Sequence, residues 1–230
     1  MNYIVCLKWG TKYGPEYVNR LANMVSRNIT VDYEFVCFTE DPVGLDKKIT
    51  IKPLPRYPLT GWWYKPYFLG SDVPLKGTLL FLDLDIIVFR NIDKLFEYNP
   101  GKFCIIRDFN RNVRKNFDYM NSSVFRVETG QYQNLWKEFL KNSKSHLSRN
   151  RGDQDWMQKH IHDHVYWPDE WIQSYKWEMR SKKDLTVVNG KRNFKDDKPP
   201  KILPDTSIAV FHGLPNPKDC NDSWVKKHWV

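Results

Sequence analysis

Two aspartates interrupt an otherwise apolar stretch in the middle of the chain. Asp83 and Asp85 stand between the apolar runs 79–82 and 86–89. Side chains alternate between the two faces of a strand, so carboxylates two positions apart point to the same side. Burying unpaired carboxylates is costly, which argues for a compensating cation. At the carboxyl end of a buried strand, we expect this pair to hold a divalent metal ion and, through it, a diphosphate. The alternative is that one aspartate caps a turn and the other is solvated.

The composition is that of a globular protein with room for one domain and a cleft. The chain has 230 residues, of which 41% are hydrophobic and 27% charged, and its mean hydropathy is −0.64. No apolar stretch approaches the roughly 18–20 residues that span a bilayer, and the first residues lack the basic region of a signal peptide. Cys6, Cys37, Cys104 and Cys220 form no CxxC pair. We therefore expect reduced core cysteines in a cytoplasmic protein without a transmembrane segment.

The formal net charge of +9 raises the question of a polyanionic partner. Lysines and arginines are scattered along the chain and accompany no recognisable nucleic-acid-binding motif, so we expect no nucleic-acid partner. Basic charge equally suits an enzyme whose donor is a nucleotide diphosphate. The ten tryptophans include candidates for stacking on the apolar face of a sugar ring. A non-catalytic, basic module that binds polyanions stays open as an alternative.

The front of the chain alternates strands with helices. Apolar runs predict strands at 3–7, 34–38, 49–51 and 78–82, and helices at 16–27 and 63–69. This alternation is typical of a parallel sheet with crossover helices.

After Asp85 the pattern changes to short strands between polar turns. We expect strands at 86–89, 103–107, 123–127 and 208–211, helices at 132–142 and 154–160, and a mobile basic loop at 182–200. The predicted fold is a single α/β, Rossmann-like domain over residues 1–230, with a mixed, mainly parallel central sheet flanked by helices. Residues 1–85 would form the half of the domain that binds the nucleotide. Residues 86–230 would form the half that binds the rest of the substrate.

Five short segments, in order along the chain, resemble the motifs of one enzyme family. They are Trp63-Tyr64-Lys65, Leu82-Asp83-Leu84-Asp85, Asn121-Ser122-Ser123, Asp153-Gln154-Asp155, and His212-Gly213 with Lys218 six positions after the histidine. Together they resemble the motifs of the metal-dependent GT-A glycosyltransferases, most closely the glycogenin and galactosyltransferase (family 8-like) type.

This resemblance implies a GT-A fold, a UDP-sugar donor, and Mn²⁺ or Mg²⁺ as cofactor. Asp83, Asp85 and His212 would hold the metal, and an imidazole ligand suits Mn²⁺ better than Mg²⁺. The alternative for His212 is a hydrogen-bonded core histidine. The enzyme would transfer a hexose-type sugar to a glycan, lipid or protein acceptor that the sequence does not identify. Peripheral contact with a membrane is left open.

The resemblance also implies roles around the donor. Asp153, Gln154 and Asp155 would be the catalytic residues beside the sugar, orienting hydroxyls or stabilising an oxocarbenium-like centre. Asp153 also fits a helix N-cap. Asp153 and Asp155 are both candidates for an inverting base, so the stereochemistry stays open. The other implied donor contacts are Lys65, Leu84, Gly213 and Lys218 near the diphosphate, and Lys8, Trp9, Tyr13, Thr39 and Asp41 near the base and ribose.

A second enzyme class also places a DxD after an apolar strand. In phosphatases of the haloacid dehalogenase type, the first aspartate is the nucleophile and the second an acid or base. Those enzymes usually carry the motif on their first strand and an acidic pair near the end of the domain. Here the motif follows several α/β elements, and Asp196-Asp197 lies in a segment rich in lysine and proline. The phosphatase is therefore the weaker alternative.

Overall fold

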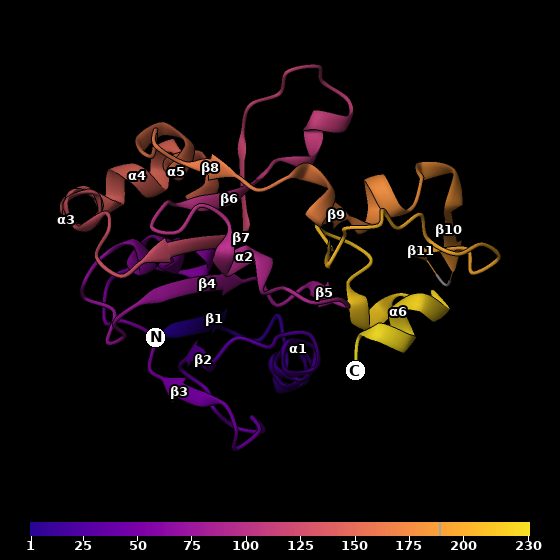
Figure 1. Cartoon of the computed structure of the whole chain (residues 1–230), viewed down its shortest axis with the longest axis horizontal. Helices are drawn as coiled ribbons and strands as arrows, with labels where there is room; N and C mark the ends of the chain where they lie inside the picture. Colours follow the sequence, from indigo (N-terminus) through magenta and orange to yellow (C-terminus); the bar gives the residue numbers. More distant parts are fainter. Residues whose placement is uncertain (189) are drawn as a thin grey trace.

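The computed structural model describes residues 1–188 and 190–230. Its central sheet has the strand order β3-β2-β1-β4-β7-β6-β8 (Figure 1). The strands are β1 (Asn2–Lys8), β2 (Tyr33–Thr39), β3 (Thr50–Lys52), β4 (Thr78–Leu82), β6 (Cys104–Arg107), β7 (Met120–Glu128) and β8 (Val165–Tyr166). Strands β3, β2, β1 and β4 are parallel, whereas β7 runs antiparallel to both β4 and β6. The predicted mixed, mainly parallel sheet is confirmed.

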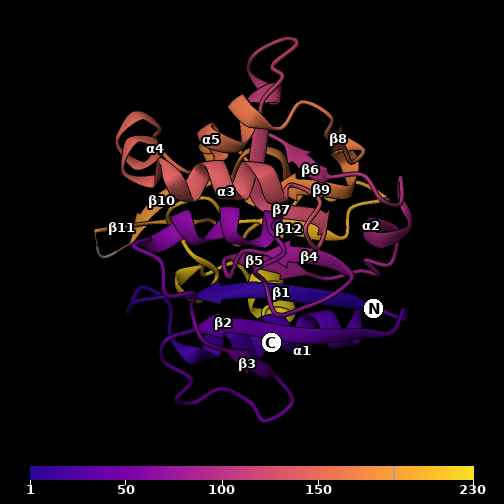
Figure 2. The same ribbon diagram turned by 90° about the vertical axis from the view of Figure 1, so that its left-hand side faces the viewer.

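Both faces of the central sheet are covered, which explains why its strands read as continuous apolar runs. Along β1, Ile4 and Cys6 join the hydrophobic cluster that includes α1 (Pro15–Arg27). The alternate residues Val5 and Leu7 join a second cluster, formed with the 3₁₀ helix η1 (Gly61–Leu69), α3 (Gln133–Lys141) and α5 (Asp153–His160). Figure 2 shows these layers from the side. The helix predicted at 63–69 is therefore present, as a 3₁₀ helix that accommodates Pro66.

A second, three-stranded sheet joins the end of the chain to its middle. It has the order β5-β12-β9, formed by β5 (Ile86–Val88), β12 (Ile208–Val210) and β9 (Ile172–Ser174). Strand β12 runs antiparallel to β5 and parallel to β9. Just beyond β12, the amide of Phe211 donates to the carbonyl of Asp85 at 2.9 Å. The strand pairing thereby brings His212 to the DxD segment.

The remaining elements are short. They are the helices α2 (Lys94–Glu97), α4 (Ser143–Arg149) and α6 (Ser223–His228), and the single turns η2 (Phe109–Asn112), η3 (Asp169–Trp171), η4 (Tyr175–Met179), η5 (Lys182–Asp184) and η6 (Pro217–Asp219). In the described parts of the chain, no helix is both long enough and apolar enough to cross a membrane. The four cysteines are free and buried, as expected.

The segment 182–200, predicted as a mobile basic loop, contains regular structure over part of its length. Strands β10 (Leu185–Val188) and β11 (Lys191–Phe194) pair antiparallel there, and Asn189 lies outside the described residues. The Asn-Gly dipeptide between these runs is a hairpin signal that the polarity of the segment obscured. Phe194 is only 2% exposed and anchors the hairpin in the core.

A buried arginine fixes β7, the strand that carries Asn121-Ser122-Ser123. Arg126 is 1% exposed. Its Nη1 donates to the carbonyl oxygens of Leu95 and Phe96, both at 2.8 Å, and its Nη2 to those of Asn99 at 2.6 Å and Lys102 at 3.2 Å. Four carbonyl oxygens between Leu95 and Lys102 thus share one buried guanidinium as donor. Arg126 therefore fastens α2 and the following loop to the sheet.

We predict that Arg126→Ala lowers the free energy of unfolding by about 3 kcal/mol or more, because hydrogen bonds to a charged group contribute roughly 1.5–3 kcal/mol each and a cavity is left. Urea unfolding followed by circular dichroism measures the change. Arg149, exposed at the end of α4, is the control. Arg149→Ala should change stability by no more than about 0.5 kcal/mol. Equal effects of the two substitutions would contradict the role of Arg126.

Candidate active site

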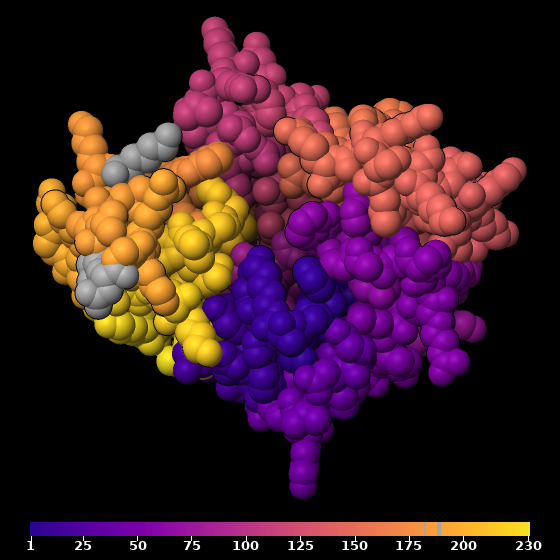
Figure 3. Space-filling model, turned by 180° about the vertical axis from the view of Figure 1, so that it is seen from behind, coloured from indigo at the N-terminus to yellow at the C-terminus, as the bar shows by residue number. Residues whose placement is uncertain are grey.

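A cavity of about 380 Å³ opens at the carboxyl ends of β1 and β4. Figure 3 looks onto the face where segments from the beginning, middle and end of the chain meet around this hollow. Ligands of open α/β sheets bind at this edge. The cavity is lined by Leu7, Trp9, Lys12, Tyr13, Trp62, Lys65, Asp83, Leu84, Asp85, Asn121, Ser122, Ser123, Gly152, Asp153, Gln154, Phe211 and His212.

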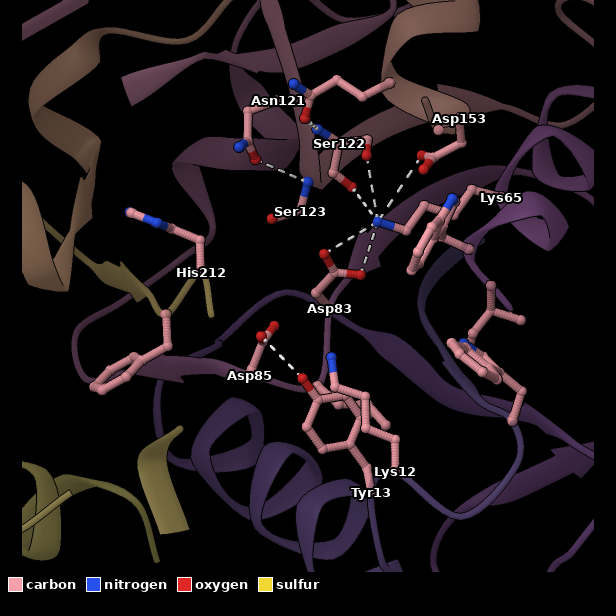
Figure 4. A pocket seen from close by; sticks show the side chains of 17 residues that line it. Lys12, Tyr13, Lys65, Asp83, Asp85, Asn121, Ser122, Ser123, Asp153 and His212 are labelled. Atoms are coloured by element: carbon pink, nitrogen blue, oxygen red, sulfur yellow. Dashed lines mark hydrogen bonds and ion pairs between the residues drawn. The ribbon is translucent and has the colours of Figure 1, made fainter. Parts of the chain in front are cut away.

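Both aspartates of the DxD line this cavity, in the turn directly after β4. Leu84 between them is 3% exposed and packs into the core. The Tyr13 hydroxyl donates to Asp85 Oδ2 at 3.0 Å (Figure 4). Burial, and secondly the charge of Asp83, raise the pKa of Asp85 to about 6. The two carboxylates thus lie close enough to repel each other.

Lys65 is the cation that connects two of the acidic residues of the cavity. It is 5% exposed, on η1. Its Nζ lies 2.8 Å from Asp83 Oδ1 and 4.0 Å from Asp153 Oδ2, and it donates to the carbonyl of Ser122 at 3.0 Å. Burial lowers the pKa of Lys65, but the charges of Asp83 and Asp153 outweigh burial and raise the pKa above its ordinary value. Figure 4 shows Lys65 at the centre of these contacts.

Asp153 and Gln154 enter the cavity from the first turn of α5. Asp153 is 4% exposed, and its Oδ2 has no hydrogen-bond partner among the described residues. Burial raises the pKa of Asp153, and the charge of Lys65 opposes this. Gln154 is held at both ends of its amide: Oε1 accepts from the Ser122 amide at 3.2 Å, and Nε2 donates to Asp108 Oδ2 at 3.4 Å. One oxygen of Asp153 is therefore buried in the wall of this cavity without a hydrogen-bond partner among the described residues.

Asp155, the third predicted catalytic residue, is turned away from this cavity. It contacts the Tyr119 hydroxyl and forms an ion pair with Arg151 at 2.9 Å. It lines a neighbouring hollow of about 710 Å³, which meets the first cavity at Gly152 and Gln154. The structure thus brings Asp153 and Gln154 together and places Asp155 on their far side.

His212 lines the cavity, but its ring is engaged elsewhere. Its Nε2 lies 2.6 Å from Ser174 Oγ, and its ring stacks on Phe109. Figure 4 shows the imidazole pointing away from Asp83 and Asp85. Burial, and secondly the charge of Lys176, lower the pKa of His212 to about 4, so the ring is neutral near pH 7.

The residues present fit a divalent cation in part. Asp83 and Asp85 offer the carboxylate oxygens that hard cations prefer, and the raised pKa of Asp85 reflects a negative charge that a cation would offset. Among the residues that the structure describes, no three histidine, cysteine or acidic side chains are gathered as a metal site. Because Ser174 engages Nε2 of His212, this nitrogen can become a third ligand only if the ring leaves Ser174. Its role as a ligand stays a prediction.

The residues predicted for the base and ribose separate into two groups. Trp9 and Tyr13 line the cavity, although the ring of Tyr13 packs on Tyr17 and its hydroxyl binds Asp85. Lys8, Thr39 and Asp41 do not line it. They form their own cluster at the ends of β1 and β2, in which Lys8 Nζ lies 3.2 Å from Asp41 Oδ2 and Thr39 Oγ1 accepts from the Asp41 amide at 3.0 Å.

The predicted contacts after His212 also lie outside the cavity. Lys218 Nζ forms an ion pair with Glu16 Oε1 at 2.6 Å. Gly213 lines a different hollow, together with Lys176 and Leu214. Their roles in diphosphate binding stay predictions that would need this segment to move.

Several positions and contacts of the site are not evident from the motifs alone. Lys12 and Trp62 line the cavity beside predicted residues, and their nearness to Tyr13 and Lys65 in sequence was the available signal. Ser174 holds His212, and Asp108 holds Gln154. These last two contacts join segments far apart in the chain, so no local sequence pattern predicts them.

We predict that Lys65→Met lowers the free energy of unfolding by about 3 kcal/mol, because it leaves the buried carboxylate of Asp153 and that of Asp83 without a cation. Lys12→Met is the matched control, since Lys12 lines the same cavity but forms no ion pair among the described residues. It should change stability by about 0.5 kcal/mol or less. Denaturant unfolding at pH 7 without metal measures both. If Lys65→Met loses no more stability than the control, Lys65 does not stabilise these carboxylates.

No protein-family profile matches this chain, and no curated protein matches it in sequence. Solved structures do match. An active-site mutant of LgtC, in which a glutamine is replaced by glutamate, superposes with a TM-score of 0.67 at 12% identity, covering 98% of this chain and 93% of LgtC. The galactosyltransferase LgtC in complex with donor and acceptor sugar analogues gives a TM-score of 0.64 at 12% identity, with the same coverage.

The glycosyltransferase GlyE of Streptococcus pneumoniae TIGR4 gives a TM-score of 0.60 at 14% identity, covering 94% of this chain and 56% of GlyE. At these identities the likeness concerns the fold. It spans nearly the whole chain in both comparisons. The GT-A fold predicted from the motifs is thereby confirmed: this chain has the fold of these glycosyltransferases.

Proposed function

We propose that this protein is a metal-dependent glycosyltransferase that moves a hexose-type sugar from a UDP-sugar to an acceptor. The observation that carries the proposal is the single cavity in which Lys65 connects Asp83 of the DxD to Asp153, next to Gln154. Its position at the carboxyl edge of the sheet and the fold shared with LgtC and GlyE support it. The acceptor would be a glycan, lipid or protein.

At the diphosphate end, Asp83 and Asp85 would hold Mn²⁺ or Mg²⁺. When bound, the ion would supply Lewis-acid neutralisation of the charge that develops on the leaving diphosphate. Lys65 pairs with Asp83, and the Tyr13 hydroxyl fixes the orientation of Asp85. Lys12 lines the same end and adds a positive charge toward the diphosphate.

At the sugar end, the chain offers one free acceptor and one fixed amide. The unpartnered Oδ2 of Asp153 would accept a hydrogen bond from a sugar hydroxyl. The Gln154 amide cannot rotate freely, because Ser122 and Asp108 hold its two ends. A carbonyl dipole fixed in this way stabilises positive charge that develops at the anomeric carbon. Asp155 faces the neighbouring hollow, so we assign it to the acceptor side.

The division of the chain into two halves and its location in the cell rest on other observations. We propose that residues 1–85 mainly bind the nucleotide and 86–230 the sugar and acceptor, because Lys12 and Tyr13 lie at one end of the cavity and Asp153 at the other (Figure 4). We also propose a cytoplasmic location, which four free cysteines support.

The metal-dependent step is tested with Asp85→Asn. The substitution removes a carboxylate ligand but keeps the size and an acceptor for Tyr13. We expect the affinity for UDP in the presence of Mn²⁺ to fall at least about 100-fold, at or beyond the upper range for loss of a metal-site partner. Isothermal titration calorimetry with and without Mn²⁺ gives the comparison. Thermal stability without metal should not fall, because the variant relieves repulsion from Asp83. Unchanged Mn²⁺-dependent affinity would refute the metal assignment.

The reaction class is tested with Gln154→Ala. We expect this variant to release UDP from a UDP-hexose at least about 100-fold more slowly while it binds UDP and Mn²⁺ as the wild type does, because Gln154 acts at the sugar end alone. A coupled assay for UDP release gives the rate.

The phosphatase alternative predicts a different outcome. In that case Asp83 would itself be phosphorylated, and Gln154 would not matter. Rapid hydrolysis of p-nitrophenyl phosphate by the wild type, with the same rate in Gln154→Ala, would replace the glycosyltransferase by a phosphatase.

A further inference from the structure

An exposed tryptophan stands in the wall of the cavity. Trp62 on η1 is 48% exposed, whereas Trp63 and Tyr67 on the same helix are 7% and 6% exposed. Trp62 lines the cavity with Gly152, Asp153 and Gln154. A large aromatic face left open in a concave site is a ready surface for an apolar part of a ligand.

Two glycines determine where Trp62 lies along the cavity. Gly61 has φ +64°, and a Cβ there would lie 3.3 Å from the Trp9 ring, so the nucleotide-end tryptophan packs directly against it. A Cβ on Gly152 would lie 3.2 Å from Trp62 Nε1. The wall therefore runs from Trp9 through Gly61 and Trp62 to Gly152. Trp62 stands at the end of the cavity where Asp153 and Gln154 begin α5.

That end of the cavity has both an apolar surface and a polar group. Trp62 offers an apolar face, and Asp153 offers a buried carboxylate oxygen without a partner among the described residues. A hexopyranose has the matching surfaces, because its C–H groups form an apolar face and its hydroxyls form a polar edge. A nucleobase fits less well there, since Trp9, Lys12 and Tyr13 occupy the other end.

We propose that Trp62 is the platform on which the hexopyranose of the donor stacks, with a hydroxyl of that ring bound to Asp153, and that Trp62 thereby determines which nucleotide-sugars the site accepts. The proposal rests on the proposed function and adds a specificity-determining residue to it. Trp62 contributes to binding of the sugar and not of the nucleotide.

The test is isothermal titration calorimetry in Mn²⁺ without acceptor, with UDP, UDP-glucose and UDP-galactose as separate ligands. Trp62→Ala should bind UDP within about twofold of the wild type and bind the preferred UDP-hexose about 5- to 10-fold more weakly, as expected for loss of an aromatic contact. Trp62→Phe should recover part of the loss and, as the milder change, keeps the test valid if Trp62→Ala unfolds. Tyr64→Ala is the matched control, because Tyr64 lies on the same helix but does not line the cavity.

The outcomes separate this inference from the proposed function. A wild type that binds UDP-hexoses, with Trp62→Ala binding them equally well, overturns the platform and leaves the glycosyltransferase standing. Equal weakening of UDP and UDP-hexose in Trp62→Ala also overturns it, because Trp62 would then contact the nucleotide. A wild type that binds neither UDP nor any UDP-hexose with Mn²⁺ removes the proposed function and the platform together.

Discussion

The ion pairs of Lys65 are the contact on which the site depends. One buried ammonium group lies 2.8 Å from Asp83 and 4.0 Å from Asp153, and it also binds the carbonyl of Ser122. These partners come from the end of β4, the start of α5 and β7, so a single charge fixes three elements around the cavity. Breaking a buried pair leaves an uncompensated charge, which costs more than the intact pair contributes. Among the described residues Asp85 forms no such ion pair, and burial together with the charge of Asp83 raises its pKa.

The second constraint is that a strand near the end of the chain pairs with strands from its middle. Strand β12 inserts between β5 and β9, and Phe211 binds the carbonyl of Asp85. His212 follows directly, so strand pairing alone brings it to the DxD segment. Its final orientation depends on a further contact, the hydrogen bond with Ser174 at the end of β9. The backbone thus decides that His212 reaches the site, and a side-chain contact decides which way its ring points.

The sequence predicted well what depends on local pattern. The strands of the front half are buried on both faces and read as apolar runs, and the turn after β4 was found because Asp83 and Asp85 break such a run. It did not predict contacts between distant segments, such as Ser174 with His212. The hairpin β10–β11 was missed because its strands are short and β11 is polar apart from Phe194, which lies in the core.

The net charge of the whole chain and the net charge of the groups inside the cavity have opposite signs. The whole chain carries a net charge of +9, which favours the approach of an anionic donor. Inside the cavity, however, the carboxylates of Asp83, Asp85 and Asp153 outnumber the ammonium groups of Lys12 and Lys65. A diphosphate entering alone would therefore meet repulsion at close range, where the screening by salt is weakest. Under the proposed function, a cation that accompanies the diphosphate to Asp83 and Asp85 would offset this local repulsion. Binding of nucleotide should for this reason be weak without a divalent ion, although the protein as a whole is basic.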